Sequence, residues 1–181
     1  PSGSNFAIER FEPKYFAGVD SYNELMLSPH FYQRFRAFAY VLICQLDVFV
    51  FADRLQEFCD LGYDYIGAPW PNVLPTSAGK EKFFLFVGNG GFTLRRVKSC
   101  IDVLSKNAEL IAALRRNNNA VPTLIGPMRP SEDTVFACLG RMKPKQFRVA
   151  PIRTASQFSV EVLPERYCRK NENVLPFGCH A

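Results

Sequence analysis

The chain has 181 residues, of which 48% are hydrophobic and 14% aromatic, and a formal net charge of +5. This length and composition predict a single domain over residues 1–181 and exclude a disordered or fibrous chain. The positive charge favours an anionic partner such as a nucleic acid, a sugar nucleotide or an anionic membrane. No apolar run reaches the ~18 residues of a membrane span, and the polar start is unlike a signal peptide, so we expect at most peripheral membrane contact.

The predicted elements alternate along the chain. The expected helices cover residues 20–27, 29–38, 53–61, 96–116 and 131–142. The expected strands cover residues 39–51, 63–70, 83–96 with an interruption at 88–91, and 147–152. Residues 71–82 and 116–130 are rich in proline, glycine or asparagine and are expected to be loops, the first long enough to close over a ligand. This order predicts an α/β fold with a mostly parallel central sheet flanked by helices.

The six cysteines are scattered and form no C-x-x-C pair. Neither a zinc site nor a disulfide framework is therefore indicated. We expect reduced, mostly buried thiols in a cytoplasmic protein.

One charge interrupts the most apolar stretch of the chain. Asp47 stands within YVLICQLDVFVF, residues 40–51, which otherwise reads as a fully buried strand. Burying an unpaired carboxylate costs several kcal/mol, so an exposed strand end or a bound metal is the natural place for this residue. The competing interpretation is a turn residue that caps a local amide.

A second candidate is the glycine-rich segment Gly88, Asn89, Gly90 and Gly91. Residues without a Cβ allow the backbone to approach a ligand closely, and the exposed N–H groups suit hydroxyl or phosphate oxygens. The spacing fits neither a dinucleotide-binding fingerprint nor a P-loop. A β-bulge or a tight turn is the alternative.

Three further residues can carry chemistry. Glu132 and Asp133 are candidates for a catalytic base, although acidic residues are common in the first turn of any helix. His180 is one of two histidines and can ligate a metal, although a lone histidine is more often a surface or packing residue. The basic residues at positions 115–116 and 141–148 lack the interleaved aromatic residues of a nucleic-acid reader, so no nucleic-acid partner is expected.

Several blocks together resemble a known group of proteins. They are SYNELMLSPHFYQRF, YVLICQLDVFVF, GYDYIGAPW, VGNGGFTLRRV, SED and PFGCHA, and they span residues 16–181 in order. The chain resembles a group of microbial proteins described mainly as a domain of unknown function and placed among glycosyltransferases of GT-A type. The resemblance implies a GT-A-like fold and the transfer of a sugar from a nucleotide-sugar donor to a glycan or lipid-linked acceptor, as in polysaccharide biosynthesis.

The resemblance also implies a cofactor. GT-A enzymes hold a divalent cation, Mn²⁺ or Mg²⁺, with an Asp-x-Asp motif, and Gln45-Leu46-Asp47 stands in that place here. The first acid is replaced by Gln45, which leaves Asp47 as the expected metal ligand and Gln45 as an expected contact of the donor or acceptor. His180 suits the C-terminal histidine that completes the metal shell in several GT-A families.

The remaining roles follow from the same resemblance. The segment from Gly88 to Gly91 resembles a loop that lines the sugar and acceptor pocket, with Phe92 and Trp70 expected to stack on a pyranose face. Asp133 resembles the general base of inverting members, and Glu132 is the adjacent candidate.

One departure from the GT-A pattern supports an alternative to an enzyme. GT-A domains usually open with a strand, helix, strand unit, and nothing before Phe16 matches it, so we expect a domain that is incomplete at its N-terminus. The alternative to an enzyme is a non-catalytic nucleotide- or glycan-binding module.

Overall fold

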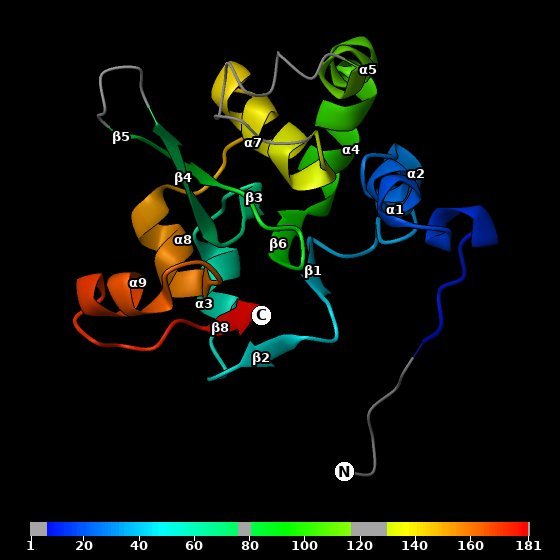
Figure 1. The fold of residues 1–181 in the computed structure, drawn as a ribbon. Coiled ribbons are helices and arrows are strands. Elements are labelled where there is room, and N and C mark those ends of the chain that lie inside the picture. The colour runs from blue at the N-terminus through cyan, green and yellow to red at the C-terminus, as the bar shows by residue number, and fades with distance from the viewer. Residues whose placement is uncertain (1–6, 76–80, 117–129, 181) are drawn as a thin grey trace.

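The computed structural model describes residues 7–75, 81–116 and 130–180. Short helices surround three small sheets (Figure 1). The helices are η1 (Pro13–Phe16), α1 (Val19–Met26), α2 (Pro29–Gln33), α3 (Leu55–Asp60), α4 (Val97–Lys106), α5 (Ala108–Arg116), α7 (Glu132–Met142), α8 (Ile152–Phe158) and α9 (Pro164–Lys170). The strands are β1 (Tyr40–Cys44), β2 (Val48–Val50), β3 (Tyr65–Ile66), β4 (Pro69–Pro75), β5 (Glu81–Val87), β6 (Phe92–Arg96), β7 (Ser159–Val160) and β8 (Gly178–His180).

The sheets are almost entirely antiparallel. One has the order β1-β6-β3, one the order β2-β8-β7, and β4 pairs with β5. Within the described residues, parallel pairing is confined to β7 with β8 and to a bridge between Tyr65 and Val149. The prediction of a mostly parallel, GT-A-like central sheet is therefore wrong for the part of the chain that the structure describes.

The error arose from the apolar run at residues 40–51. The run does not form one buried strand, because a turn closed by the Val48 N–H and the Gln45 carbonyl (3.2 Å) divides it into β1 and β2. Each piece lies at the edge of a different sheet, so much of the run is solvent-exposed, including Leu46 and Phe49. A continuous apolar run therefore does not by itself identify a strand covered on both faces.

Other elements were predicted with mixed success. The start of α2 is confirmed, because Ser28 accepts a hydrogen bond from the His30 N–H (3.2 Å) and Pro29 follows it. The range of α7 is confirmed, with Ser131 at the N-cap. The predicted loop at 71–82 is wrong at both ends, since β4 extends to Pro75 and β5 begins at Glu81; residues 76–80, like 117–129 of the second predicted loop, lie outside the described residues. The predicted strand at 147–152 is reduced to the single bridge at Val149.

Two hydrophobic cores lie on the two faces of the β1-β6-β3 sheet. Successive residues of a strand point to opposite faces, and β6 accordingly sends Phe92 and Leu94 into one core. The larger core gathers buried residues of α2, α4, α5 and α7 with Tyr65 of β3. Arg95 of β6 points toward this larger core, with its guanidinium 5.2 Å from the centre of the Phe136 ring. The sheet therefore carries a buried charge between its strands and the helices.

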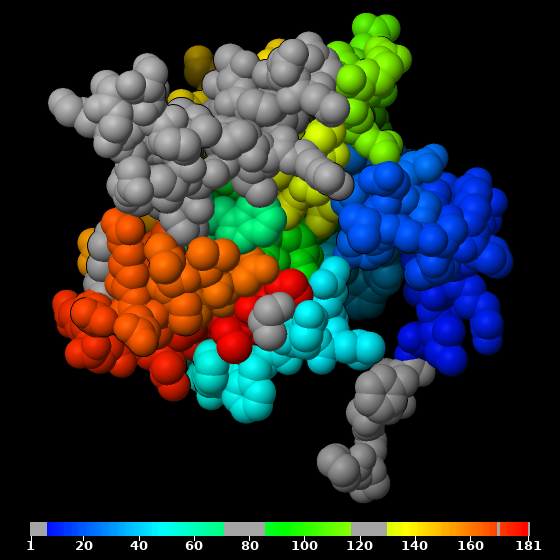
Figure 2. Space-filling view, viewed as in Figure 1, coloured from blue at the N-terminus to red at the C-terminus, as the bar shows by residue number. Residues whose placement is uncertain are grey.

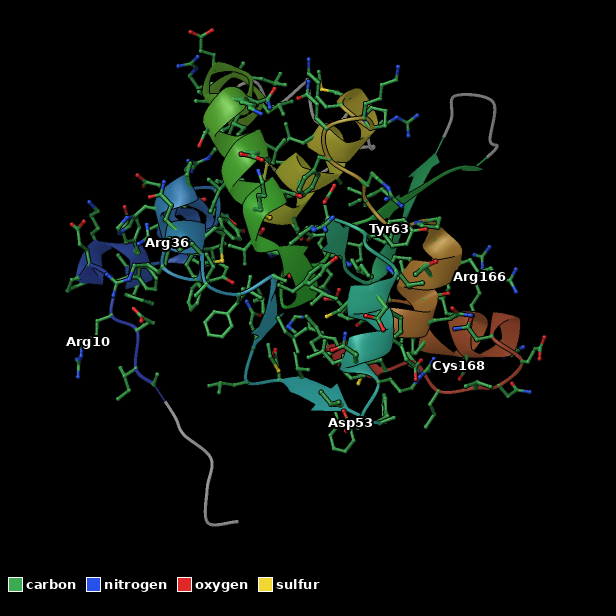
Figure 3. The ribbon with its side chains drawn as sticks, turned by 180° about the vertical axis from the view of Figure 1, so that it is seen from behind. Arg10, Arg36, Asp53, Tyr63, Arg166 and Cys168 are labelled. Carbon is green, nitrogen blue, oxygen red and sulfur yellow. The ribbon has the colours of Figure 1, made fainter. Side chains whose placement is uncertain are left out.

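The view from behind separates the two halves of the molecule. Arg36, which follows α2, lies on one side, and Arg166 and Cys168 of α9 lie on the other (Figure 3). None of the described helices has the length and apolar character needed to cross a membrane.

Candidate functional site

A cleft of about 600 Å³ opens between distant parts of the chain. In Figure 2 the blue N-terminal segment lies on one side of the molecular face and the orange and red C-terminal segments on the other, with green and yellow parts of the chain visible between them. Tyr15 and Tyr22 line the cleft from the N-terminal side, Glu161 and His180 from the C-terminal side, and Glu132 also lines it.

The floor of the cleft is the turn between β5 and β6. Asn89 has a left-handed backbone (φ 52°), and its Oδ1 accepts a hydrogen bond from the Gly91 N–H (2.8 Å). The Gly91 carbonyl in turn accepts the N–H of Gln45 (2.9 Å), which joins this turn to the one that holds Asp47. A Cβ at Gly91 would lie 2.3 Å from His180 Nε2. The expected close approach to glycine backbone is therefore present, and the group that approaches is the imidazole of His180.

His180 brings the predicted metal ligands together. Its Nε2 lies 3.1 Å from Asp47 Oδ1 and 3.2 Å from Gln45 Oε1. The pairing of β8 with β2, in which His180 is opposite Val48, places the ring beside the turn. Neighbouring donors on an octahedral cation with bonds of about 2.1 Å stand about 3 Å apart. The two distances from Nε2 are therefore close to the spacing of neighbouring ligands on such a cation, and we call the three donor atoms the His180 corner.

The other ring nitrogen, Nδ1, contacts a carboxylate that was not predicted from the sequence. His180 Nδ1 lies 3.3 Å from Glu161 Oε1 and 3.3 Å from Asn89 Nδ2. Glu161 Oε2 accepts a hydrogen bond from the indole N–H of Trp70 (2.8 Å). Glu161 directly follows β7, a strand of two residues that no periodicity in the sequence reveals. Among the described residues, no three His, Cys, Asp or Glu side chains converge as a metal site.

A buried ion pair lies beside the floor. Arg95 Nη2 is 2.9 Å from Glu132 Oε1, and both side chains are almost fully buried. Burial raises the pKa of Glu132, against the opposing effect of the Arg95 guanidinium. Glu132 Oε2 is buried without a hydrogen-bond partner among the described residues. The pair has little access to solvent, which is unlike the arrangement of a base that must meet an acceptor.

Asp133 differs from Glu132 in its partners. It lines the cleft at the start of α7, and its Oδ1 accepts hydrogen bonds from the Ser131 hydroxyl and from the Thr134 N–H (2.8 Å). These donors fix the orientation of the carboxylate. Asp133 is 7% exposed, without a Lys or Arg partner among the described residues.

The remaining predicted residues are divided between the cleft and the core. Trp70 and Gly90 line the cleft, and the Trp70 ring meets Phe86 edge-on at 5.8 Å. Phe92 is fully buried, with its ring stacked on Phe158 at 5.0 Å, and so does not present a face to the cleft. Gly88 is buried, with its carbonyl 3.5 Å from the Tyr65 hydroxyl. The aromatic side chains from η1 and α1 that line the cleft were not predicted, because short N-terminal helices carry no functional signature.

Comparison with known proteins shows the family to which this chain belongs. Residues 5–180 match the family described as a protein of unknown function, DUF5672. This match covers nearly the whole sequence, so the chain belongs to that family. No curated protein and no solved structure matches the chain. The family description assigns no activity, and the resemblance to GT-A glycosyltransferases stays an expectation.

Proposed function

We propose that this protein is a metal-assisted glycosyltransferase that moves a sugar from a nucleotide-sugar donor to a glycan or lipid-linked acceptor. The observation that carries the proposal is that Gln45, Asp133 and His180, at least 47 residues apart in the printed sequence, line one cleft, with Asp47 in contact with His180. Most of the residues that the resemblance implied line this one cleft. The predicted parallel sheet, which was expected to bring them together, is absent from the described residues.

The charge of the cleft supports a role for a cation. Its described lining includes Glu132, Asp133 and Glu161, but no Lys or Arg. Such a surface repels a diphosphate, so an anionic donor needs a positive charge that the lining side chains do not supply. Asp47, His180 and Gln45 would hold Mn²⁺ or Mg²⁺, which when bound neutralises charge on the departing diphosphate.

Asp133 is the proposed general base. Two donors hold its Oδ1, so we assign acceptance of the proton from the acceptor hydroxyl to Oδ2. Glu132 is assigned a structural role, because its carboxylate is paired with Arg95 and buried. Tyr22 and Trp70 offer aromatic surface on which a sugar ring can pack.

The proposal is tested by release of nucleoside diphosphate from a panel of nucleotide sugars, with Mn²⁺ and with glycan or lipid-linked acceptors. Loss of a general base costs about 10²- to 10⁴-fold in rate, so Asp133→Asn should lose transfer to that degree. Glu165→Gln, a change on the exposed face of α9, is the matched control and should keep full activity. Undiminished transfer by Asp133→Asn would sink the assignment of the base.

A non-catalytic nucleotide- or glycan-binding module is the second candidate. It is favoured by the lack of three convergent His, Cys, Asp or Glu side chains in the described parts of the chain. Such a module binds its ligand equally well in Mn²⁺ and in EDTA, whereas the transferase requires the cation for donor binding.

The proposal includes a cytoplasmic location. All six cysteines are free, which suits a reducing compartment, although only Cys100 and Cys138 are buried and the predicted burial of most thiols is wrong. Peripheral contact with a membrane that carries a lipid-linked acceptor belongs to the same proposal.

A further inference from the structure

We infer that Glu161 is a positioning residue that selects the tautomer of His180 in which Nε2 is free to bind a cation. The inference rests on the metal-assisted function proposed above and assigns a role to a carboxylate outside the implied metal ligands. It also assigns Trp70 a role, as the group that holds Glu161 in place.

For His180 to bind a cation through Nε2, the proton of the neutral ring must be on Nδ1. A neutral imidazole carries one proton, and the nitrogen without it is the one that binds a metal. Nε2 faces Asp47 Oδ1 and Gln45 Oε1, whereas Nδ1 faces Glu161 Oε1 at 3.3 Å. When Glu161 accepts the Nδ1–H, the lone pair of Nε2 points toward the other two donors of the His180 corner. A carboxylate behind a metal-binding histidine commonly fixes its tautomer and ring orientation in this way.

Asn89 acts in the opposite sense. Its Oδ1 is taken by the Gly91 N–H, so its Nδ2 is the atom directed at His180 Nδ1, 3.3 Å away. An amide donor at this point favours a lone pair on Nδ1 and hence a proton on Nε2. Without a cation, Asp47 Oδ1 and Gln45 Oε1 also favour a proton on Nε2, because both oxygens accept hydrogen bonds. Glu161 is therefore the group that opposes this tautomer and favours the one in which a cation replaces the proton on Nε2.

Trp70 fixes the carboxylate. Its indole N–H donates to Glu161 Oε2 at 2.8 Å, which leaves Oε1 directed at the ring. The Glu161 side chain is 20% exposed and the His180 side chain 13%, so water competes with these contacts only in part. The order of contacts is Trp70, Glu161, His180 and then Asp47.

The test measures Mn²⁺ alone, with no nucleotide, by electron paramagnetic resonance of the free ion. In Glu161→Gln the one acceptor oxygen of the amide is claimed by the Trp70 N–H, and the amide NH₂ then faces Nδ1 as a donor. This change imposes the tautomer with the proton on Nε2. Mn²⁺ affinity should fall about 10- to 100-fold, the usual effect of removing such a partner.

A second variant separates position from charge. Trp70→Phe removes the indole donor but keeps the Glu161 charge, so a purely electrostatic role for Glu161 predicts unchanged affinity, and a positioning role predicts a loss of several-fold. Asp47→Asn is the positive control for loss of a ligand, and Glu165→Gln is the control for loss of an exposed carboxylate. Thermal unfolding of each variant without metal establishes that the protein is folded.

A further readout reports the tautomer directly. The chain has only two histidines, and His30 is exposed on α2, so ¹⁵N-histidine labelling gives one reference ring and the ring of interest. With Cd²⁺ as a diamagnetic ion, wild-type His180 should show a protonated Nδ1, and Glu161→Gln should show a protonated Nε2.

The outcomes distinguish the inference from the function on which it rests. Weakened Mn²⁺ binding in both Glu161→Gln and Trp70→Phe supports it. Binding by the wild type that is lost in Asp47→Asn but unchanged in Glu161→Gln overturns the inference alone. No Mn²⁺ binding by the wild type overturns the metal-assisted function and the inference together.

Discussion

The Arg95–Glu132 pair and the His180 corner, at two ends of the cleft, differ in how fully their charged groups are buried and paired. At one end Arg95 and Glu132 form a pair whose side chains are 0% and 3% exposed. At the His180 corner the Asp47 side chain is 53% exposed, and His180 stands between two carboxylates and two amides. Arg95 and Glu132 are each other's main partner inside the fold. At the corner, four side chains compete for the two ring nitrogens of His180.

This difference predicts which changes affect the stability of the fold and which affect binding. A charge buried with its partner is costly to leave alone, so changes at the Arg95 end should destabilise the fold. A half-exposed carboxylate contributes little to stability, so changes at the His180 corner should alter binding and leave the fold intact. Two acidic sites 85 residues apart in the printed sequence, at Asp47 and Glu132, thus have different roles.

The largest expected effect is at the buried end. Arg95→Met leaves the Glu132 carboxylate buried without a partner, which should lower the free energy of unfolding by about 3–5 kcal/mol in urea denaturation. The double variant Arg95→Met with Glu132→Gln removes the stranded charge and should recover part of this loss. A loss below about 1 kcal/mol in the single variant would contradict the structural role of the pair.

Adjacent glycines provide a matched pair of intermediate effect. A Cβ at Gly90 would lie 1.9 Å from Glu132 Oε1, and a Cβ at Gly91 would lie 2.3 Å from His180 Nε2. Gly90→Ala should cost about 1–3 kcal/mol of stability, because the buried carboxylate cannot move away. Gly91→Ala should mainly turn the His180 ring out of the corner and lower Mn²⁺ affinity at least tenfold. Equal losses of stability in the two variants would remove the distinction between the two ends.

The smallest expected effect concerns pH. Burial raises the pKa of Glu132, so the folded protein holds this proton more tightly than the unfolded chain does. The resulting stabilisation is complete below the unfolded pKa of about 4.3 and is lost as the pH rises through the higher folded value. Glu132→Gln lacks this proton, so the wild type should lose free energy of unfolding relative to this variant as the pH rises above about 4.3. Parallel pH profiles in urea denaturation would show that Glu132 keeps an ordinary pKa.

The sequence predicted local features better than their assembly. Ser28 and Pro29 mark the start of α2, because a cap depends on nearby backbone groups. Ser131 stands at the N-cap position of α7, although its side chain makes no capping hydrogen bond there. Strand pairing depends on contacts between distant segments, and nothing in residues 40–51 indicates that β1 and β2 join different sheets.

The site followed the same pattern. Asp47 and His180 were recognised by residue type and by resemblance, and the structure places them in contact. Phe92 was misassigned because an aromatic residue after glycines can face either side of a strand, and here it faces the core. Glu161 was missed because its role comes only from its contacts with Trp70 and His180.

Calorimetric titration with the nucleoside 5′-diphosphates of uridine, guanosine, adenosine and cytidine, in Mn²⁺ and in EDTA, tests whether the cleft is a metal-assisted nucleotide-sugar site. We expect one of them to bind the wild type at least tenfold more tightly in Mn²⁺ than in EDTA, and Asp47→Asn to lose this difference. Equal affinity in Mn²⁺ and in EDTA, or no binding in either, would contradict a metal-assisted nucleotide-sugar site in this cleft.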